Sequence, residues 1–214
     1  MDLHVILTFT AVACVAILSP GPATLLAMRN GTTFGVRSVV WSALGNVSGL
    51  VCLSGASMLG LGILLQSSAW LFAALKILGA LYLFYLGLRQ LLGHTTAVVL
   101  PARDGMAAPT QPRPLQLYRE ALLTALTNPK PILFFSALFP QFIHAQAPLL
   151  PQFCVLTGIF VTISFTTLIS YAHLAYRASS WLARPGLAIW VNRTFGAIFI
   201  GFGAALLNLR RQAI

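Results

Sequence analysis

The chain has 214 residues, of which 58% are hydrophobic and only 7% are charged, with 13 Lys or Arg and 3 Asp or Glu. A soluble domain carries roughly 25% charged residues, and so few polar groups cannot cover the surface of a soluble fold. The composition therefore indicates an integral membrane protein. The same numbers exclude a disordered chain, a nucleic-acid-binding arm and a secreted disulfide scaffold.

Long uncharged runs divide into six predicted transmembrane helices, because a helix needs roughly 20 apolar residues to cross a bilayer. Continuous apolar runs favour helices over a membrane β-barrel, whose strands would alternate in hydrophobicity. The start of the chain is expected to be the first span and not a cleavable signal peptide, because Met1–His4 carries no basic segment. The six helices are expected at about residues 3–28, 39–65, 69–92, 120–142, 152–176 and 190–209.

Arginines set the predicted orientation of these helices. The loops after the first, third and fifth helices carry most of them, while the loops after the second and fourth carry no Lys or Arg. Because cytoplasmic loops are enriched in Lys and Arg, both termini are predicted to lie in the periplasm of a bacterial inner membrane, although Arg210 and Arg211 oppose this. The net charge of +10 is interpreted as a topology and lipid-headgroup signal, and no nucleic-acid partner is expected. The arginines in or beside the three loops are Arg29, Arg37, Arg89, Arg103, Arg113, Arg119, Arg177, Arg184 and Arg193.

A proline-rich segment, residues 93–118, is expected to be a flexible cytoplasmic linker between two units of three helices each, residues 1–92 and residues 119–214. An odd number of spans inserts the second unit upside down relative to the first. The predicted fold is therefore an all-α membrane protein of six transmembrane helices in two inverted repeats.

Two double-proline motifs fall in the first helix of each unit, Ser19-Pro20-Gly21-Pro22 and Asn128-Pro129-Lys130-Pro131. Proline removes a backbone donor, so the freed carbonyl groups must find partners or line a wet cavity. Interrupted helices at matching positions of two repeats are typical of a transporter's substrate site. Two unrelated proline kinks are the alternative interpretation.

Lys130 and Lys76 lie inside predicted spans, where no acidic side chain is available to neutralise them. A lysine costs about 2.5–3.5 kcal/mol at the centre of a membrane helix. Each therefore either extends to the lipid headgroups or binds an anionic ligand group such as a carboxylate. His173, in the fifth predicted helix, is the titratable candidate for proton coupling, and a structural or boundary histidine is the alternative.

At these motifs the chain resembles the LysE family of amino-acid exporters, in the subgroup of homoserine, threonine and homoserine-lactone efflux proteins. The resemblance covers nearly the whole chain, and its most specific part is Leu126-Thr127-Asn128-Pro129-Lys130 leading to Phe139-Pro140-Gln141-Phe142. Pro131 departs from the pattern, because small residues are more usual there. The resemblance implies a six-helix inner-membrane permease with substrate-binding candidates Ser19, Pro20, Gly21, Pro22, Asn128, Pro129 and Lys130.

The predicted function is export of small neutral amino acids or their derivatives, similar to threonine or homoserine, by alternating access and driven by an ion gradient, expected to be of protons. The lack of acidic groups in the spans disfavours lysine or arginine as the substrate. No cofactor, metal ligand set or catalytic nucleophile–base pair is recognised, so the chain is not expected to be an enzyme. Efflux of another small ion, such as a metal cation, and a non-transporting membrane scaffold are the alternative functions.

Overall fold

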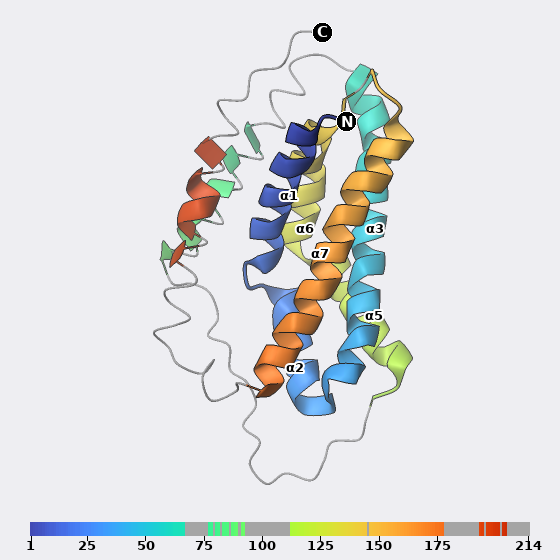
Figure 1. Ribbon diagram of the computed structural model, residues 1–214, viewed down its shortest axis with the longest axis vertical. Helices are drawn as coiled ribbons and strands as arrows, with labels where there is room; N and C mark the ends of the chain where they lie inside the picture. The colour runs from blue at the N-terminus through green and yellow to red at the C-terminus, as the bar shows by residue number, and fades with distance from the viewer. Residues whose placement is uncertain are drawn as a thin grey trace.

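The computed structural model describes the following residues: 1–66, 77–78, 80–81, 83–85, 87–89, 91–92, 112–144, 146–177, 193–194, 196–201 and 203–204. These residues are almost entirely helical, and no strand occurs among them. The elements are α1 (Leu3–Leu18), α2 (Pro22–Phe34), α3 (Val36–Gln66), α5 (Pro114–Thr127), α6 (Pro129–Leu133), a π-helical turn (Phe134–Leu138), a 3₁₀ turn (Phe139–Phe142) and α7 (Leu149–Arg177) (Figure 1).

Four of the predicted spans are present in the described part of the chain if each bent helix pair is counted as one span. Residues 36–60 of α3 and the whole of α7 are long and apolar enough to cross a bilayer. The other two are broken, because α1 and α2 meet at 56° and α5 meets residues 129–142 at 49°. The two breaks fall at the double-proline motifs, as the sequence predicts. Of the third and sixth predicted helices, separate short stretches that make up about half of the residues are described.

Helix boundaries differ from the predictions at the arginine-rich end of the bundle. We expected the first helix to end near residue 28 and Arg29 to lie in a loop, but α2 continues to Phe34 and includes Arg29. The helix ends there because Gly35 has a φ of 87°, which only glycine adopts easily. At the start of the fourth span, α5 begins at Pro114 and not near residue 120, because the side chain of Gln116 accepts a hydrogen bond from the Arg113 backbone N–H at 3.0 Å.

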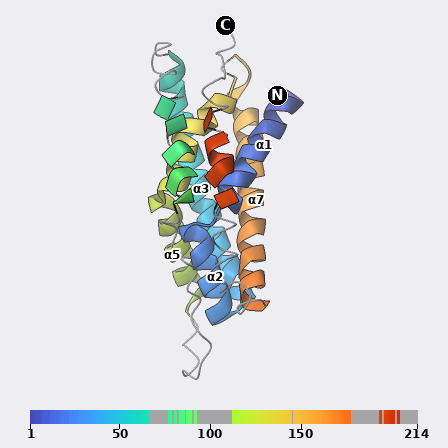
Figure 2. The ribbon, with the colours of Figure 1, turned by 90° about the vertical axis from the view of Figure 1, so that its left-hand side faces the viewer.

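The two long helices α3 and α7 run the length of the bundle, and the broken spans pack beside them. The short arms α2 and α5 lie at the same end, and the N-terminus lies at the opposite end (Figure 2). Five arginines belong to helices or helix ends at the end that holds α2 and α5: Arg29 on α2, Arg37 at the start of α3, Arg113 and Arg119 at the start of α5, and Arg177 at the end of α7.

Aromatic side chains fill the half of the bundle near the N-terminus. The ring of Phe9 on α1 contacts Phe134 and Phe139 edge to face, and Phe134 and Phe135 both contact Phe160 on α7. These rings anchor the π-helical and 3₁₀ turns, which are irregular backbone inside an apolar region. The described interior is therefore packed with aromatic rings on this side of the breaks.

Glycines let α3 approach α5 closely. A Cβ atom added at Gly45 would collide with the backbone carbonyl of Tyr118, and one at Gly49 would lie 2.7 Å from Cβ of Ala125. By contrast, no described atom lies within 4 Å of a Cβ added at Gly55. The small residues of α3 near its start thus serve close helix packing, as they commonly do in membranes.

We predict that Gly45→Ala destabilises the folded protein by about 1–3 kcal/mol, because the methyl group forces α3 and α5 apart. Gly55→Ala on the same helix is the matched control, and it should be neutral or slightly stabilising because alanine is the better helix former. The measurement is the midpoint of thermal denaturation in detergent. Equal midpoints for the two variants would contradict this close contact between α3 and α5.

Candidate functional site

The two helix breaks meet at the side chain of Lys130. Its Nζ atom donates a hydrogen bond to the backbone carbonyl of Ser19 at 2.6 Å, across 111 residues of sequence. A second donor reaches the same break from α7: the Tyr171 hydroxyl donates a hydrogen bond to the backbone carbonyl of Leu18 at 2.7 Å. In a continuous helix the Leu18 carbonyl would be bonded by residue 22, but Pro22 has no N–H. Side chains from the other half of the chain thus bond the carbonyls at the first break.

The second break is shaped by Asn128, which ends α5 and caps α6. Its side-chain oxygen accepts a hydrogen bond from the backbone N–H of Lys130 at 3.1 Å, as an N-cap residue does. Pro129 and Pro131 flank Lys130, and both lack the N–H that a continuing helix would need. This short capped turn fixes the backbone from which the Lys130 side chain extends toward the first break.

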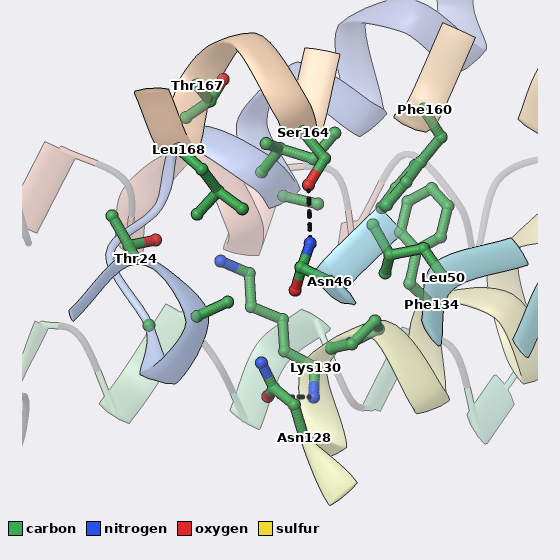
Figure 3. A pocket seen from close by; sticks show the side chains of 15 residues that line it. Thr24, Asn46, Leu50, Asn128, Lys130, Phe134, Phe160, Ser164, Thr167 and Leu168 are labelled. Atoms are coloured by element: carbon green, nitrogen blue, oxygen red, sulfur yellow. Dashed lines mark hydrogen bonds between the residues drawn. The ribbon is translucent and has the colours of Figure 1, made fainter. Parts of the chain in front are cut away.

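A cavity of about 60 Å³ lies where the breaks meet, between α1, α2, α3, α6 and α7 (Figure 3). Since about 10–15 Å³ of such volume holds one water, the cavity has room for about four to six waters. Together these waters fill about the volume of a small amino acid. The lining residues are Ala16, Ile17, Gly21, Ala23, Thr24, Asn46, Leu50, Asn128, Lys130, Pro131, Phe134, Phe160, Ser164, Thr167 and Leu168.

The polar lining of the cavity is neutral apart from Lys130. Asn46 on α3 donates its side-chain N–H to the Ser164 hydroxyl on α7 at 3.1 Å, and both side chains are buried. The buried hydroxyl groups of Thr24 and Thr167 belong to the same lining. Figure 3 shows the Lys130 side chain extending from α6 into this pocket. Apart from Asn128, the remaining described wall is apolar.

Lys130 forms no salt bridge with any side chain that the structure describes. The ion pair found among these residues joins Arg29 and Glu120, which lie on α2 and α5. Neither Asp nor Glu lines the cavity in the described part of the chain. The site therefore combines one cation with neutral donors and acceptors, which is an environment for a ligand that brings its own negative charge.

Comparison with known proteins identifies the family. The model of the LysE type translocator family matches residues 14–210. The chain belongs to this family. Similar proteins cover most of the chain: an uncharacterised membrane protein of Vibrio cholerae is 35% identical over 212 residues, covering 98% of this chain and 100% of that protein. A homoserine/homoserine lactone efflux protein of Salmonella typhimurium is 36% identical over 196 residues, covering 90% and 91% of the two chains.

A further relative, an uncharacterised membrane protein of Pseudomonas aeruginosa, is 36% identical over 203 residues and covers 93% of both chains. No solved structure matches this LysE-type translocator. The family, the names of the relatives and the apolar helices agree that the protein is a membrane efflux transporter.

The translocator brings four of the residues singled out from the sequence to one place: Lys130, Asn128 and Gly21 line the cavity, and Ser19 contributes its carbonyl. A Cβ atom added at Gly21 would lie 3.8 Å from Nζ of Lys130, so this glycine keeps space open beside the ammonium group.

The other candidates lie elsewhere. Pro20, Pro22 and Pro129 shape the breaks but are not among the described lining residues. Lys76 is outside the described residues. His173 lies on an exposed face of α7 and does not belong to the described lining of the cavity.

Four polar lining residues of the translocator were not singled out from the sequence: Thr24, Asn46, Ser164 and Thr167. A signal for two of them was present, because Ser164 and Thr167 are three residues apart on α7 and share a helix face with Leu168. Asn46 is a carboxamide within an uncharged span, and a buried polar group of this kind requires a partner.

We predict that Tyr171→Phe destabilises the translocator by about 0.5–1.5 kcal/mol, because the Leu18 carbonyl loses its side-chain donor. Tyr118→Phe on α5 is the matched control, since the described part of the chain shows no hydrogen bond from that hydroxyl. Thermal denaturation in detergent measures both. A Tyr171→Phe protein that unfolds at the same temperature as its parent would argue against a structural role for this bond.

Proposed function

We propose that this translocator exports small neutral amino acids or their derivatives, similar to threonine or homoserine, across the bacterial cytoplasmic membrane. The transport mechanism is alternating access between two inverted units joined by a cytoplasmic linker, which is shorter than the sequence predicts because α5 already begins at Pro114. The observation that carries the proposal is the Lys130 ammonium group, which faces a cavity of amino-acid size without an acidic partner among the described residues.

The position of Lys130 favours a ligand-binding role over extension toward lipid headgroups. Its ammonium group contacts the Ser19 carbonyl at the first break instead of continuing along its own helix. An ammonium group has three N–H donors, so this contact leaves donors for a substrate carboxylate. The first turn of α2 adds further donors, because Ala23 and Thr24 line the cavity and no side-chain hydrogen bond caps this turn in the described structure.

The rest of a zwitterionic amino acid matches the neutral polar wall. The amide oxygen of Asn46 is suited to accept from the substrate ammonium group, and the Asn46–Ser164 pair is suited to bind a hydroxyl on the substrate side chain. Lysine and arginine are disfavoured as substrates, because no carboxylate in the described lining would stabilise a side-chain cation. The homoserine/homoserine lactone efflux protein among the relatives supports this choice of substrate class.

Orientation and coupling complete the proposal. Because Arg29, Arg113, Arg119 and Arg177 lie at one end of the bundle, we assign that end to the cytoplasm and both termini to the periplasm. We further propose that export is coupled to the proton gradient. His173 would act in it from outside the described cavity lining.

A metal-cation exporter fits the site less well. The Lys130 ammonium group would repel a cation, and the described residues contain no group of three or more His, Cys, Asp or Glu side chains that could hold a metal ion. A scaffold without transport activity has no use for a polar cavity at two helix breaks.

We predict that Lys130→Ala lowers exchange of labelled threonine or homoserine at least about tenfold, because it removes a charged hydrogen-bond donor to the carboxylate. Lys130→Arg should retain more activity, since it keeps the charge. The measurement is counterflow in proteoliposomes with a panel of labelled amino acids and one divalent cation.

The control for the Lys130 variants is Arg119→Gln, which removes an exposed charge on α5 outside the cavity. All variants must elute from size-exclusion chromatography as the parent does. Full exchange by Lys130→Ala would remove the role assigned to this lysine, and accumulation of the divalent cation alone would favour the metal exporter.

We predict that Ser164→Ala lowers the preference for threonine over valine about threefold to tenfold, which is the weight of one neutral hydrogen bond. Valine is the matched substrate, because it replaces the hydroxyl of threonine with a methyl group. Thr166→Ala is the matched control on α7, since Thr166 bonds the carbonyl of Thr162 in its own helix and is exposed. An unchanged ratio of threonine exchange to valine exchange in Ser164→Ala would show that this hydroxyl does not hydrogen-bond the substrate side chain.

A further inference from the structure

We propose that substrate reaches the cavity from the arginine-rich end of the bundle, along a path between α2, α3, α5 and α7 that the Arg29–Glu120 ion pair closes in this structure. The path rests on the proposed function, because it assumes a substrate that binds in the cavity. Its closing contact is a property of the protein alone and is testable without any substrate.

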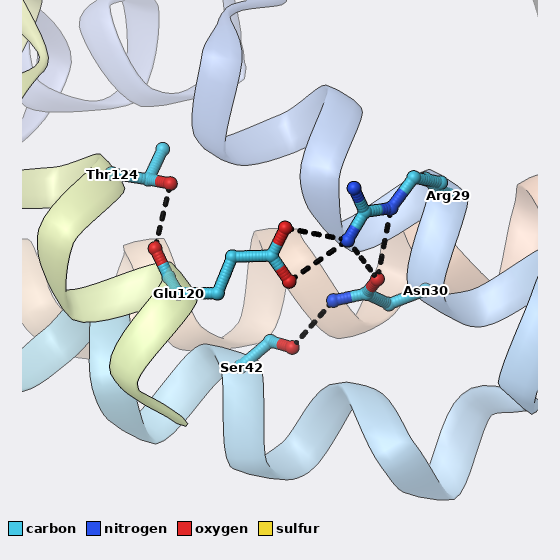
Figure 4. A network of polar contacts seen from close by, with 5 residues as sticks. All are labelled: Arg29, Asn30, Ser42, Glu120 and Thr124. Carbon is cyan, nitrogen blue, oxygen red and sulfur yellow. Dashed lines mark hydrogen bonds and ion pairs between the residues drawn. The ribbon is translucent and has the colours of Figure 1, made fainter. Parts of the chain in front are cut away.

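A polar network joins three helices at this end (Figure 4). The NH2 group of Arg29 on α2 contacts both carboxylate oxygens of Glu120 on α5, at 2.7 and 2.8 Å. The same guanidinium group bonds the side-chain oxygen of Asn30 at 2.9 and 3.2 Å. Asn30, which is fully buried, in turn donates to the Ser42 hydroxyl on α3 at 2.9 Å. One continuous network therefore holds α2, α3 and α5 together.

A second, narrower space lies between this network and the cavity. It shares Ala23, Asn46 and Leu168 with the cavity lining, and it shares Ser42 with the network. Three further residues line it: Leu26, Ala27 and Ala121. It has no room for a water molecule in this structure. The lining thus continues from the cavity to the ion pair, but the passage is closed.

The position of the ion pair suits it to open and close this passage. Glu120 and Arg29 lie on the two short arms, α5 and α2, which the proline breaks separate from the rest of their spans at angles of 49° and 56°. Much of the facing wall is made of alanines, so a modest separation of the arms clears a path without moving bulky side chains. The arms are held by charge and hydrogen bonds at their ends, where both charged side chains remain half exposed.

The composition of the chain supports a dedicated role for this contact. Only 3 residues of 214 are acidic, and one of them is placed where it bridges the two short arms. An ion pair is a suitable closing contact, because water can solvate both partners once the arms separate at an exposed end. A packed apolar contact would gain no such favourable solvation when the arms separate.

The test uses a reporter cysteine in the narrow space. Cys14, Cys52 and Cys154 are replaced by serine, and Ala121→Cys is added on the path wall, where the native side chain is buried. A membrane-impermeant maleimide then labels the full-length protein in inside-out vesicles. We predict that Glu120→Gln and Arg29→Gln each raise the labelling rate about threefold to tenfold, because the isosteric amide and the neutral side chain remove the ion pair.

Two controls separate opening of the path from general loosening. Arg119→Gln removes the neighbouring charge on α5, which makes none of the contacts of the network, and it should leave the labelling rate unchanged. The exchanged pair Arg29→Glu with Glu120→Arg restores opposite charges and should return labelling toward the parent rate.

Unchanged labelling in both single variants would overturn the proposal, and so would an equal increase in Arg119→Gln. Because labelling needs no substrate, failure of the closing contact is distinguishable from failure of the proposed transport function. A translocator that exchanges threonine but shows no change in labelling has the function without this path. A translocator that labels faster but exchanges no amino acid has the path without the function.

Discussion

The structure depends on one constraint: backbone carbonyls freed by proline inside a bilayer must be bonded by something other than their own helix. At the first break the carbonyls of Leu18 and Ser19 receive donors from Tyr171 and Lys130, which belong to α7 and α6. The break in the first half of the chain is therefore stable only when the second half is packed beside it. A cavity results at this meeting point because straight, fully bonded helices do not continue through it.

The constraint also ties binding to backbone geometry. The Lys130 ammonium group that bonds the Ser19 carbonyl is the cation that faces the cavity, so an anionic ligand there would compete with or add to a contact that shapes the first break. Asn128 likewise serves both the backbone and the cavity. Its side chain caps the turn that carries Lys130, and the residue also lines the cavity. A ligand bound at this site would contact residues of both breaks, which suits the proposed alternating-access mechanism.

Local chemistry in the sequence was enough to predict the breaks but not the whole site. Pro22 and Pro129 lack the N–H that a continuing helix would need, and each begins a new helix after a break, so the two bent spans could be predicted from the double-proline motifs. Asn46 was missed because the face of α3 that lines the cavity depends on how Gly45 and Gly49 pack against α5, which periodicity in a uniformly apolar span does not reveal. The third and sixth predicted helices are described only in separate short stretches, so the six-helix arrangement stays a prediction.

The positions of the acidic residues Glu120 and Asp2 support the proposed preference of the cavity for an anionic group. Glu120 lies at the arginine-rich end and is paired with Arg29, and Asp2 lies at the opposite end before α1. A protein carboxylate in the cavity would neutralise Lys130 and remove the attraction of the cavity for an anionic group. Because Glu120 lies away from the cavity, it pairs with Arg29 and leaves the charge of Lys130 available to a ligand. Along a path from that end, a substrate carboxylate would first meet a guanidinium group that already has a partner and then an ammonium group that has no acidic partner among the described residues. Because the unpaired cation lies deeper, the electrostatic free energy of a carboxylate would favour the cavity over the entrance.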